Sequence, residues 1–314
     1  MDNLIFSLNA TMPIFFTMLL GMLFRRLKFF DDYVVAKLNK FVFQVAIPVV
    51  LFLDLAGEDF YEVWDTKFVL FCFGATFLSV VINALLSLIL KDKSVQGEFI
   101  QAGYRSSCAL LGIAFITNIY GNAGMAPLML IGSVPLYNIM AVLVLSFFNP
   151  QHSRLDKSTI KNTAVGILKN PIIIGIFSGL LWSLLGLGIP KMLSKTLSNI
   201  SCLATPLGLM AMGASFSLKS ALKDIKPVML SVFMKLIGLA AIFIPIAVAM
   251  GFRDSFLASL LIMLGSPTTV TCFVMAKNMG HEGHFTSSAV MLTTLLSAFT
   301  LTGWLYVLKS LALL

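Results

Sequence analysis

Long apolar segments, each of about the length that crosses a lipid bilayer, recur along almost the whole chain. When about 20 mainly apolar residues are required for each spanning helix, ten candidates are found. They lie near residues 6–24, 34–55, 67–90, 99–120, 124–148, 171–189, 197–218, 228–250, 255–276 and 286–308. Only 11% of the 314 residues are charged, against about 25% in ordinary soluble domains, so polar side chains are too few to cover a water-soluble protein. The sequence therefore predicts an all-α polytopic membrane protein with ten transmembrane helices.

The distribution of basic residues predicts the orientation of these spans. With the amino terminus outside, most of the 22 Lys and Arg residues fall in cytoplasmic connections, while the external loop after the second span is acidic. Because cytoplasmic loops of membrane proteins are enriched in Lys and Arg, both termini are expected outside a plasma (inner) membrane. The net charge of +8 is interpreted in the same way, since the bases form short runs and no continuous face for nucleic acid.

Landmark residues of the first half recur in the second half at a constant offset of 158 residues. Gly21 corresponds to Gly179 at this offset, and Pro48 corresponds to Pro206. A unit of five helices thus occurs twice, and because five is odd, the second copy enters the membrane from the opposite side. This pattern predicts two inverted five-helix repeats, an arrangement typical of secondary transporters.

The repeats divide the chain into three parts. Residues 1–148 form the first five-helix repeat, residues 149–170 form a basic cytoplasmic linker, and residues 171–314 form the second repeat. We expect the two repeats to build one membrane domain.

Two basic residues inside predicted spans are the first candidates for a functional site. A charge near the bilayer centre costs about 3 kcal/mol on insertion scales, yet Arg105 lies in the fourth span and Lys235 in the eighth. Their long side chains could carry the charges to the headgroups, or they could form a site for an anion. The nearest acids, Glu98 and Asp54, lie at span ends. Coupling through a buried carboxylate is therefore not expected, which leaves Na+ held by carbonyl and hydroxyl oxygens, or a proton carried by the substrate.

Polar residues within the spans could complete the lining of a binding site. They are Asn39 and Gln44 in the second span, Ser107 and Asn118 in the fourth, Tyr137 and Asn138 in the fifth, and Ser266, Thr268, Thr269 and Thr271 in the ninth. Two simpler explanations stand beside this one. Ser and Thr often bond back to carbonyls one turn earlier in the same helix, and polar residues also hold membrane helices together.

Six stretches of the sequence carry a family resemblance. They are PIFFTMLLGMLFRR (13–26), LNKFVFQVAIPVVLF (38–52), GSVPLYNIMAVLVLS (132–146), KNPIIIGIFSGL (169–180), ATPLGLMAMGASFSL (204–218) and FVMAKNMG (273–280). Together they resemble the auxin efflux carrier family, which includes plant auxin carriers and bacterial permeases for malate or malonate. The resemblance implies a fold similar to that of bile-acid symporters and sodium/proton antiporters. In that fold the fourth and ninth helices are unwound and cross, and the substrate binds beside the crossing.

The sequence departs from this family at the crossing itself. The positions where family members often carry a crossover proline hold Ala114 and Cys272 here. Gly112 and Pro267 lie close by and could break the helices instead, since glycine lowers helix propensity and proline removes a backbone donor. Pro48 and Pro206 are expected to kink the second and seventh spans.

The residues and the resemblance together lead us to expect a secondary transporter that moves a small organic anion, such as malate, malonate or an auxin-like acid, by alternating access. The alternatives are a passive anion channel and a membrane receptor that binds its ligand without moving it. An enzyme is not expected, because the spans offer neither a pair of nucleophile and base nor a phosphate-binding loop. The expected partners are the anion, the lipid bilayer and, by resemblance, a second copy in a homodimer, with no nucleic acid and no cofactor.

No metal site is expected either. His281 and His284 flank Glu282 in the sequence GHEGH, but this spacing differs from the HExxH pattern of zinc enzymes. We interpret the segment as a solvated loop between the ninth and tenth spans.

Overall fold

The computed structural model describes residues 2–56, 64–108, 115–117, 119–122, 124–150, 165–217 and 225–314. Within these ranges every regular element is helical, as the sequence predicts. The helices are α1 (Asp2–Arg26), α2 (Asp32–Phe41), the π-helix η1 (Val42–Ala46), α3 (Ile47–Ala56), α4 (Thr66–Ser87), α5 (Gln96–Tyr104), α7 (Ala126–Phe147), α9 (Pro171–Leu184), α10 (Lys191–Ser201), α11 (Ala204–Ser215), α13 (Ile225–Phe233), the π-helix η2 (Met234–Gly238), α14 (Leu239–Ala249), α15 (Asp254–Gly265), α16 (Thr271–Asn278) and α17 (His284–Ser310).

Six stretches of the described helices are long and apolar enough to cross a membrane. They are Asp32–Ala56, Thr66–Ser87, Ala126–Phe147, Lys191–Ser215, Ile225–Ala249 and His284–Ser310. The helices α9 and α15 are apolar but shorter. Large apolar side chains such as Leu70, Ile89 and Leu184 are exposed on the outside, where lipid rather than water is the solvent that suits them.

Polar residues at the helix starts set where the helices begin. The Asp31 carboxylate accepts the backbone N–H of Val34 at 2.7 Å, and Asp65 caps α4 in the same way. Asn170, at the end of the linker, accepts the N–H of Ile172 and is followed by a proline at the first position of α9. These side chains satisfy backbone donors that have no partner inside the helix.

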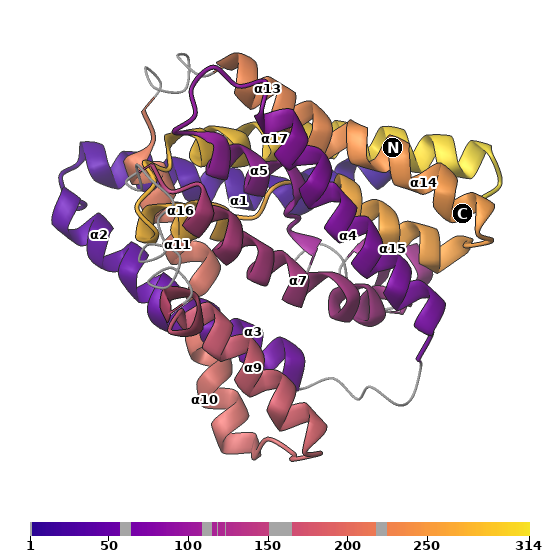
Figure 1. The fold of residues 1–314 in the computed structure, drawn as a ribbon, viewed down its shortest axis with the longest axis horizontal. Coiled ribbons are helices and arrows are strands. Elements are labelled where there is room, and N and C mark those ends of the chain that lie inside the picture. Colours follow the sequence, from indigo (N-terminus) through magenta and orange to yellow (C-terminus); the bar gives the residue numbers. More distant parts are fainter. Residues whose placement is uncertain are drawn as a thin grey trace.

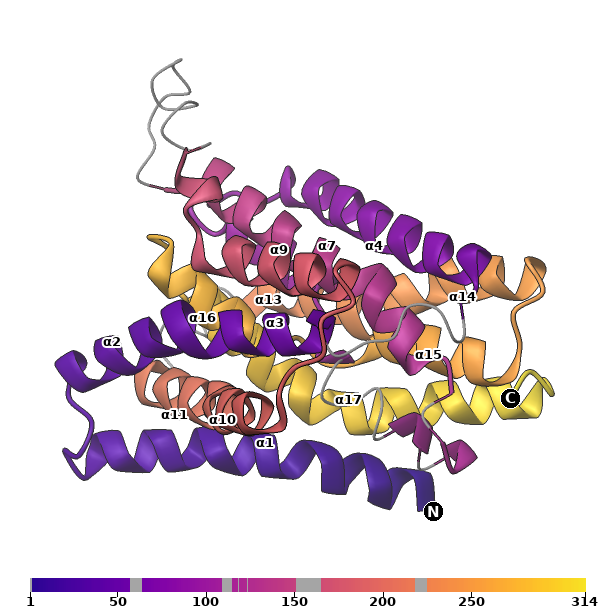
Figure 2. The ribbon, with the colours of Figure 1, turned by 90° about the horizontal axis from the view of Figure 1, so that it is seen from below.

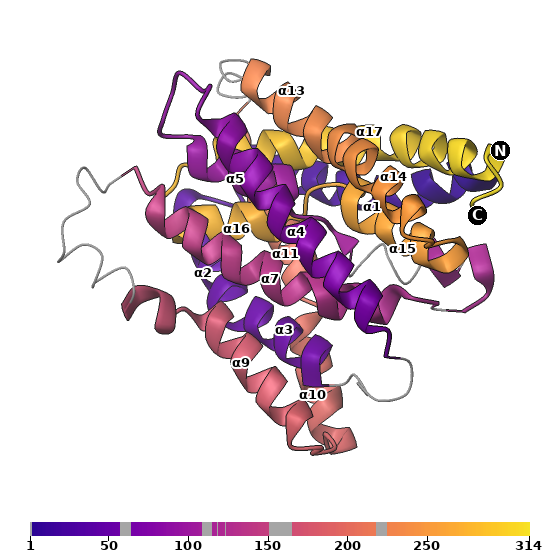
Figure 3. The ribbon, with the colours of Figure 1, turned by 45° about the vertical axis from the view of Figure 1, so that its right-hand side comes forward.

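The helices form two groups that meet at the centre of the molecule. In one group α3 packs against α9 and α10 at the lower side of the view, while α4, α7, α14, α15 and α17 lie together at the upper side (Figure 1). The helix α1 runs along α11 and α17 (Figure 2). The two chain ends lie at the same end of the molecule in every view (Figure 3).

Small residues bring helix backbones close together at two related places. A Cβ atom at Gly21 in α1 would overlap the backbone carbonyl of Met210 in α11, and one at Gly179 in α9 would lie 2.9 Å from the carbonyl oxygen of Phe52 in α3. Membrane helices often use small residues in this way, because packing rather than exclusion from water drives their association.

The two kink prolines lie directly after interruptions of their spans. Pro48 is the second residue of α3 and follows the π-helix η1 within one continuous helical stretch. Pro206 lies in the first turn of α11, after a turn at Cys202 and Leu203 separates this helix from α10.

The fourth and ninth spans are both interrupted, and the interruptions touch. Helix α5 ends at Tyr104, and Arg105 is extended, with φ −74° and ψ 133°. Helix α15 ends at Gly265, and α16 begins at Thr271. Between them, Ser266 is extended with ψ 160°, the conformation that a following proline imposes. The N–H of Ser107 donates to the carbonyl oxygen of Pro267 at 2.9 Å and joins the two breaks.

The break positions differ in part from those expected. Pro267 lies within the break of the ninth span, but Cys272 belongs to the first turn of α16 and is helical. Gly112 and Ala114 lie outside the described residues, and the helix of the fourth span ends well before them, at Tyr104.

Candidate functional site

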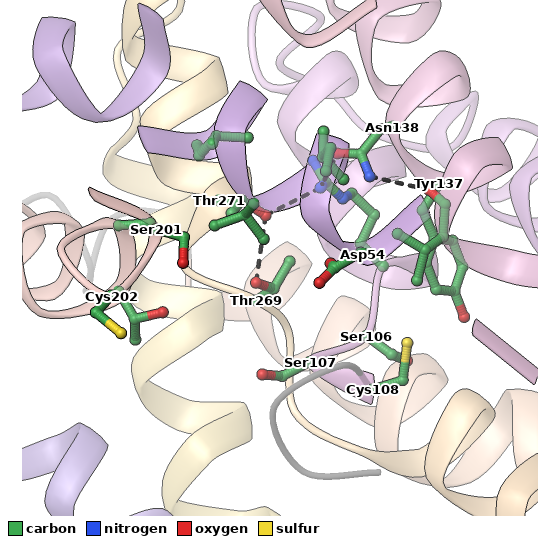
Figure 4. A pocket seen from close by; sticks show the side chains of 17 residues that line it. Asp54, Ser106, Ser107, Cys108, Tyr137, Asn138, Ser201, Cys202, Thr269 and Thr271 are labelled. Carbon is green, nitrogen blue, oxygen red and sulfur yellow. Dashed lines mark hydrogen bonds between the residues drawn. The ribbon is translucent and has the colours of Figure 1, made fainter. Parts of the chain in front are cut away.

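A cavity of about 420 Å³ is lined by residues at the two breaks and by residues of α3, α7, α10 and α11. Its lining is Ile47, Val50, Leu51, Asp54, Arg105, Ser106, Ser107, Cys108, Val134, Tyr137, Asn138, Ser201, Cys202, Ala204, Thr205, Thr269 and Thr271. Most of these residues are apolar or neutral, with a few polar groups that converge on the interior (Figure 4). This size and composition are typical of small-molecule sites.

Arg105 provides the positive charge of the cavity. The side chain is only 3% exposed, so it is held inside the protein and does not reach out to headgroups. The guanidinium donates to the Asn138 side-chain oxygen at 2.8 Å, to the Thr271 hydroxyl at 2.9 Å and to the Met275 sulfur at 2.7 Å. Its Nε has no partner among the described residues. The break after Tyr104 therefore places a fixed, incompletely paired cation at the cavity wall.

The fifth span supplies the second polar wall. In α7, Asn138 orients its side chain by donating to the Val134 carbonyl at 2.9 Å, which leaves the amide oxygen for Arg105. The Tyr137 hydroxyl donates to the Met263 carbonyl at 3.1 Å, at the end of α15. Both residues were predicted site residues, and both line the cavity.

The predicted hydroxyl residues of the ninth span separate into two sets. Thr269 and Thr271 line the cavity, and the Thr271 hydroxyl donates to that of Thr269 at 3.2 Å. Thr268 instead donates to the Ala102 carbonyl at 2.8 Å and ties the two breaks together. Ser266 is fully buried outside the lining, and its hydroxyl has no partner in the described part of the chain.

Lys235 lies away from the cavity lining. It is part of η2, is fully buried, and its ammonium donates to the Leu264 carbonyl at 2.5 Å, in the last turn of α15. Of the two embedded cations, Arg105 lines the cavity and Lys235 does not. The charge of Lys235 faces the end of a broken helix.

The remaining predicted lining residues do not meet at the cavity. Asn39 is buried, and its backbone carbonyl accepts the side-chain N–H of Asn278 at 3.2 Å. Gln44 is exposed on η1, on the outer side of its helix. Neither residue lines the cavity. Asn118 lies outside the described residues.

Asp54 was missed as a site residue and lines the cavity. The sequence places it at the end of a span, where an acid is expected to face water. It does carry a signal, since Ile47, Val50, Leu51 and Asp54 follow the i, i+3, i+4, i+7 spacing of one helix face, and all four line the cavity. The cavity thus holds one carboxylate as well as one guanidinium.

The GHEGH segment is not a solvated loop throughout, contrary to expectation. His281 is only 4% exposed, and its Nε2 lies 2.9 Å from the Leu145 carbonyl oxygen. Beside it, the buried Glu98 carboxylate accepts the N–H groups of Gly283 and Thr286 at 2.8 and 2.9 Å. Glu98 therefore caps the start of α17, where backbone donors lack helical partners. Among the described residues no cluster of metal-ligating side chains occurs.

Comparison with known proteins identifies a family and a relative that this chain is similar to. The family model described as "Membrane transport protein" matches residues 6–305. A protein of Rhizobium meliloti (strain 1021), named "Putative malonate transporter", is 25% identical over 323 aligned positions that cover 97% of each chain.

The family match spans nearly the whole chain and includes both interrupted helices and the cavity between them. The protein is accordingly an integral membrane protein, and it belongs to the membrane transport protein family, the auxin efflux carrier family that its sequence motifs resemble.

Proposed function

We propose that this transporter is a secondary carrier for a small organic anion, with malonate or a similar carboxylate as the substrate class. The observation that carries the proposal is Arg105, a buried guanidinium at the wall of a cavity beside two interrupted helices. A buried cation is costly in a membrane and indicates a functional site. The printed name of the Rhizobium meliloti relative supports the choice of malonate as the first substrate to test.

The geometry around Arg105 supports recognition of a carboxylate. Asn138 and Thr271 hold the guanidinium from one side, so that its fork is oriented before a ligand arrives. Planar N–H pairs of arginine match the two oxygens of a carboxylate. A bound anion would replace weak neutral partners by a charge-assisted pair, and the hydroxyls of Thr269 and Ser107, which also line the cavity, could complete its hydrogen bonds.

Alternating access is proposed from the internal symmetry. The contact of Gly21 with Met210 has a counterpart in the contact of Gly179 with Phe52. Gly179 lies 158 residues after Gly21, and Phe52 lies 158 residues before Met210, so each contact joins equivalent positions of the two halves in exchanged order. An inverted repeat with a two-fold axis in the membrane plane requires such exchanged pairs. This reciprocity supports ten spans in two inverted repeats, which would move one group of helices against the other.

We also propose that both chain termini lie on the outer side of the membrane. An even number of spans requires both termini on one side of the membrane, and the two chain ends lie at the same end of the molecule (Figures 1 and 3). The distribution of Lys and Arg favours the outside of the plasma (inner) membrane for both.

The test is uptake of labelled malonate into proteoliposomes by the wild type and by Arg105→Gln. We expect initial uptake to fall roughly tenfold or more in the variant, the loss that follows removal of a charge-assisted hydrogen-bond donor. Arg253→Gln is the matched control, because Arg253 is exposed, lies outside the cavity lining and donates to the backbone carbonyls of Val248 and Phe252. Wild-type uptake in Arg105→Gln would remove this residue from the site.

A further inference from the structure

The carbonyl ends of broken membrane helices are natural cation sites. The last carbonyls of a helix lack partners within it, and they form the negative end of the helix dipole. Carriers built on broken helices use such ends to coordinate a coupling Na+ or proton. At the two touching breaks, a metal cation would be expected to bind the last backbone carbonyls of α5 and α15.

Three carbonyls in the last turn of α15 accept donors from the protein itself. The Ile262 carbonyl accepts the N–H of Ser266 at 3.1 Å. The Met263 carbonyl accepts the Tyr137 hydroxyl at 3.1 Å and also the Ser106 hydroxyl. The Leu264 carbonyl, the next one along, accepts the ammonium of Lys235.

Two carbonyls in the last turn of α5 accept donors in the same manner. The Gln101 carbonyl accepts the N–H of Arg105 at 3.1 Å. The Ala102 carbonyl accepts the Thr268 hydroxyl at 2.8 Å. Five carbonyls in the last turns of α5 and α15 thus accept donors from this chain, and one of these donors is the ammonium of a buried lysine.

The Lys235 ammonium is buried at the end of α15. The residue is 0% exposed and lies in the π-helix η2, whose wider turn changes the direction of the side chains that follow. Trp304 donates to the neighbouring Leu236 carbonyl at 3.2 Å and ties η2 to α17. The hydrogen bond that Lys235 makes within the described part of the chain goes to the Leu264 carbonyl, whereas the ion pair found there joins Arg25 and Asp32.

We propose that the Lys235 ammonium is a tethered cation that occupies the site of a coupling metal ion at the end of α15. The part of this inference that is tested by malonate uptake rests on the proposed carrier function, whereas the part tested by the melting temperature does not. If a covalently attached cation already neutralises this helix end, the transport cycle needs no Na+ at the crossing. The driving ion is then a proton or the substrate's own charge.

The test compares the wild type with three variants in Na+ and in N-methylglucamine buffers. Lys235→Met keeps the volume of the side chain without its charge. Lys235→Ala also opens space beside the Leu264 carbonyl. Lys67→Met is the control, because Lys67 donates to the Met250 carbonyl at 2.6 Å in the same way but at an exposed position. Two quantities are measured, the melting temperature in detergent and the initial uptake of malonate in proteoliposomes.

The expected pattern is specific to the position. Wild type and Lys67→Met show the same melting temperature and uptake in both buffers. Lys235→Met melts lower and loses uptake roughly tenfold or more in either buffer. Lys235→Ala also melts lower but is restored in part by Na+ or by ethylammonium, which can enter the space and bind the carbonyl.

Three results would overturn the proposal. One is a saturable rise of the wild-type melting temperature with Na+, and another is a Lys235→Met variant as stable and active as the wild type. The third is a folded Lys235→Ala variant that responds to neither cation. The melting temperatures do not depend on transport. If the wild type takes up no acid, the carrier function is therefore refuted, and the melting temperatures still test the role of Lys235.

Discussion

The main-chain N–H of Ser107 donates a hydrogen bond of 2.9 Å to the carbonyl oxygen of Pro267. This bond joins the break of the fourth span to the break of the ninth, so neither segment leaves these backbone groups unpaired inside the membrane. Arg105 stands two residues before Ser107, and Thr269 stands two residues after Pro267. The bond thus fixes both walls of the cavity relative to each other.

Removal of Asn138 as a partner of Arg105 tests how the guanidinium is held. In Asn138→Leu the arginine loses its 2.8 Å acceptor and is no longer oriented toward the cavity. We expect the KM for malonate to rise roughly tenfold with protein yield unchanged. Uptake as a function of malonate concentration measures this, and an unchanged KM would show that Asn138 does not orient the guanidinium.

Removal of the Asp54 charge should change which ionic form of the substrate binds. With Asp54 ionised the cavity holds one cation and one anion, so a second carboxylate on the substrate meets repulsion. In Asp54→Asn we expect the KM for fully ionised malonate to fall by roughly tenfold. Acetate, which has one carboxylate, is the matched substrate for comparison. If the KM values for malonate and acetate change equally in Asp54→Asn, Asp54 does not repel the second carboxylate of malonate.

The close approach of helices α1 and α11 predicts a position-specific loss of stability. In Gly21→Val the new side chain would meet the backbone of Met210, and overpacking of this kind costs about 1–3 kcal/mol. Gly74→Val is the control, because a Cβ at Gly74 meets nothing within 4 Å. Thermal unfolding in detergent should separate the two variants. Equal melting temperatures would contradict the tight contact.

The tie between the two breaks can be weakened without touching the cavity lining. Thr268→Val keeps the shape of the side chain but removes the hydroxyl that donates to the Ala102 carbonyl at 2.8 Å. We expect about 1 kcal/mol of lost stability and slower uptake at an unchanged KM. A changed KM with normal stability would instead place Thr268 in contact with the substrate.

The sequence predicts the all-helical class because a bilayer imposes simple rules on it, and six of the ten expected spans correspond to described helices long and apolar enough to cross a membrane. Runs of apolar residues mark the spans, and Pro267 marks the break of the ninth span, since proline and the residue before it are both restricted. The contact of Gly179 with Phe52 repeats that of Gly21 with Met210 at the offset found in the sequence.

Which residues face the cavity is much harder to predict. Gln44 and Lys235 both lie in or beside a π-helical turn, and the extra residue of such a turn shifts the helix face that a regular period would assign. Asp54 was missed for a different reason, because an acid at a span end is expected to face water, whereas Asp54 lines the same cavity as Arg105. These outcomes depend on tertiary packing, which composition and spacing do not record.

Counterflow of labelled malonate is the measurement that tests the central claim most directly. Proteoliposomes are loaded with unlabelled malonate, and the uptake of external labelled malonate is followed against empty vesicles. A carrier with alternating access predicts saturable uptake that the internal substrate accelerates and that Arg105→Gln abolishes. Uptake that rises linearly with concentration and ignores the internal substrate would indicate a channel, and binding without any uptake would indicate a receptor. Either result would contradict the proposed mechanism.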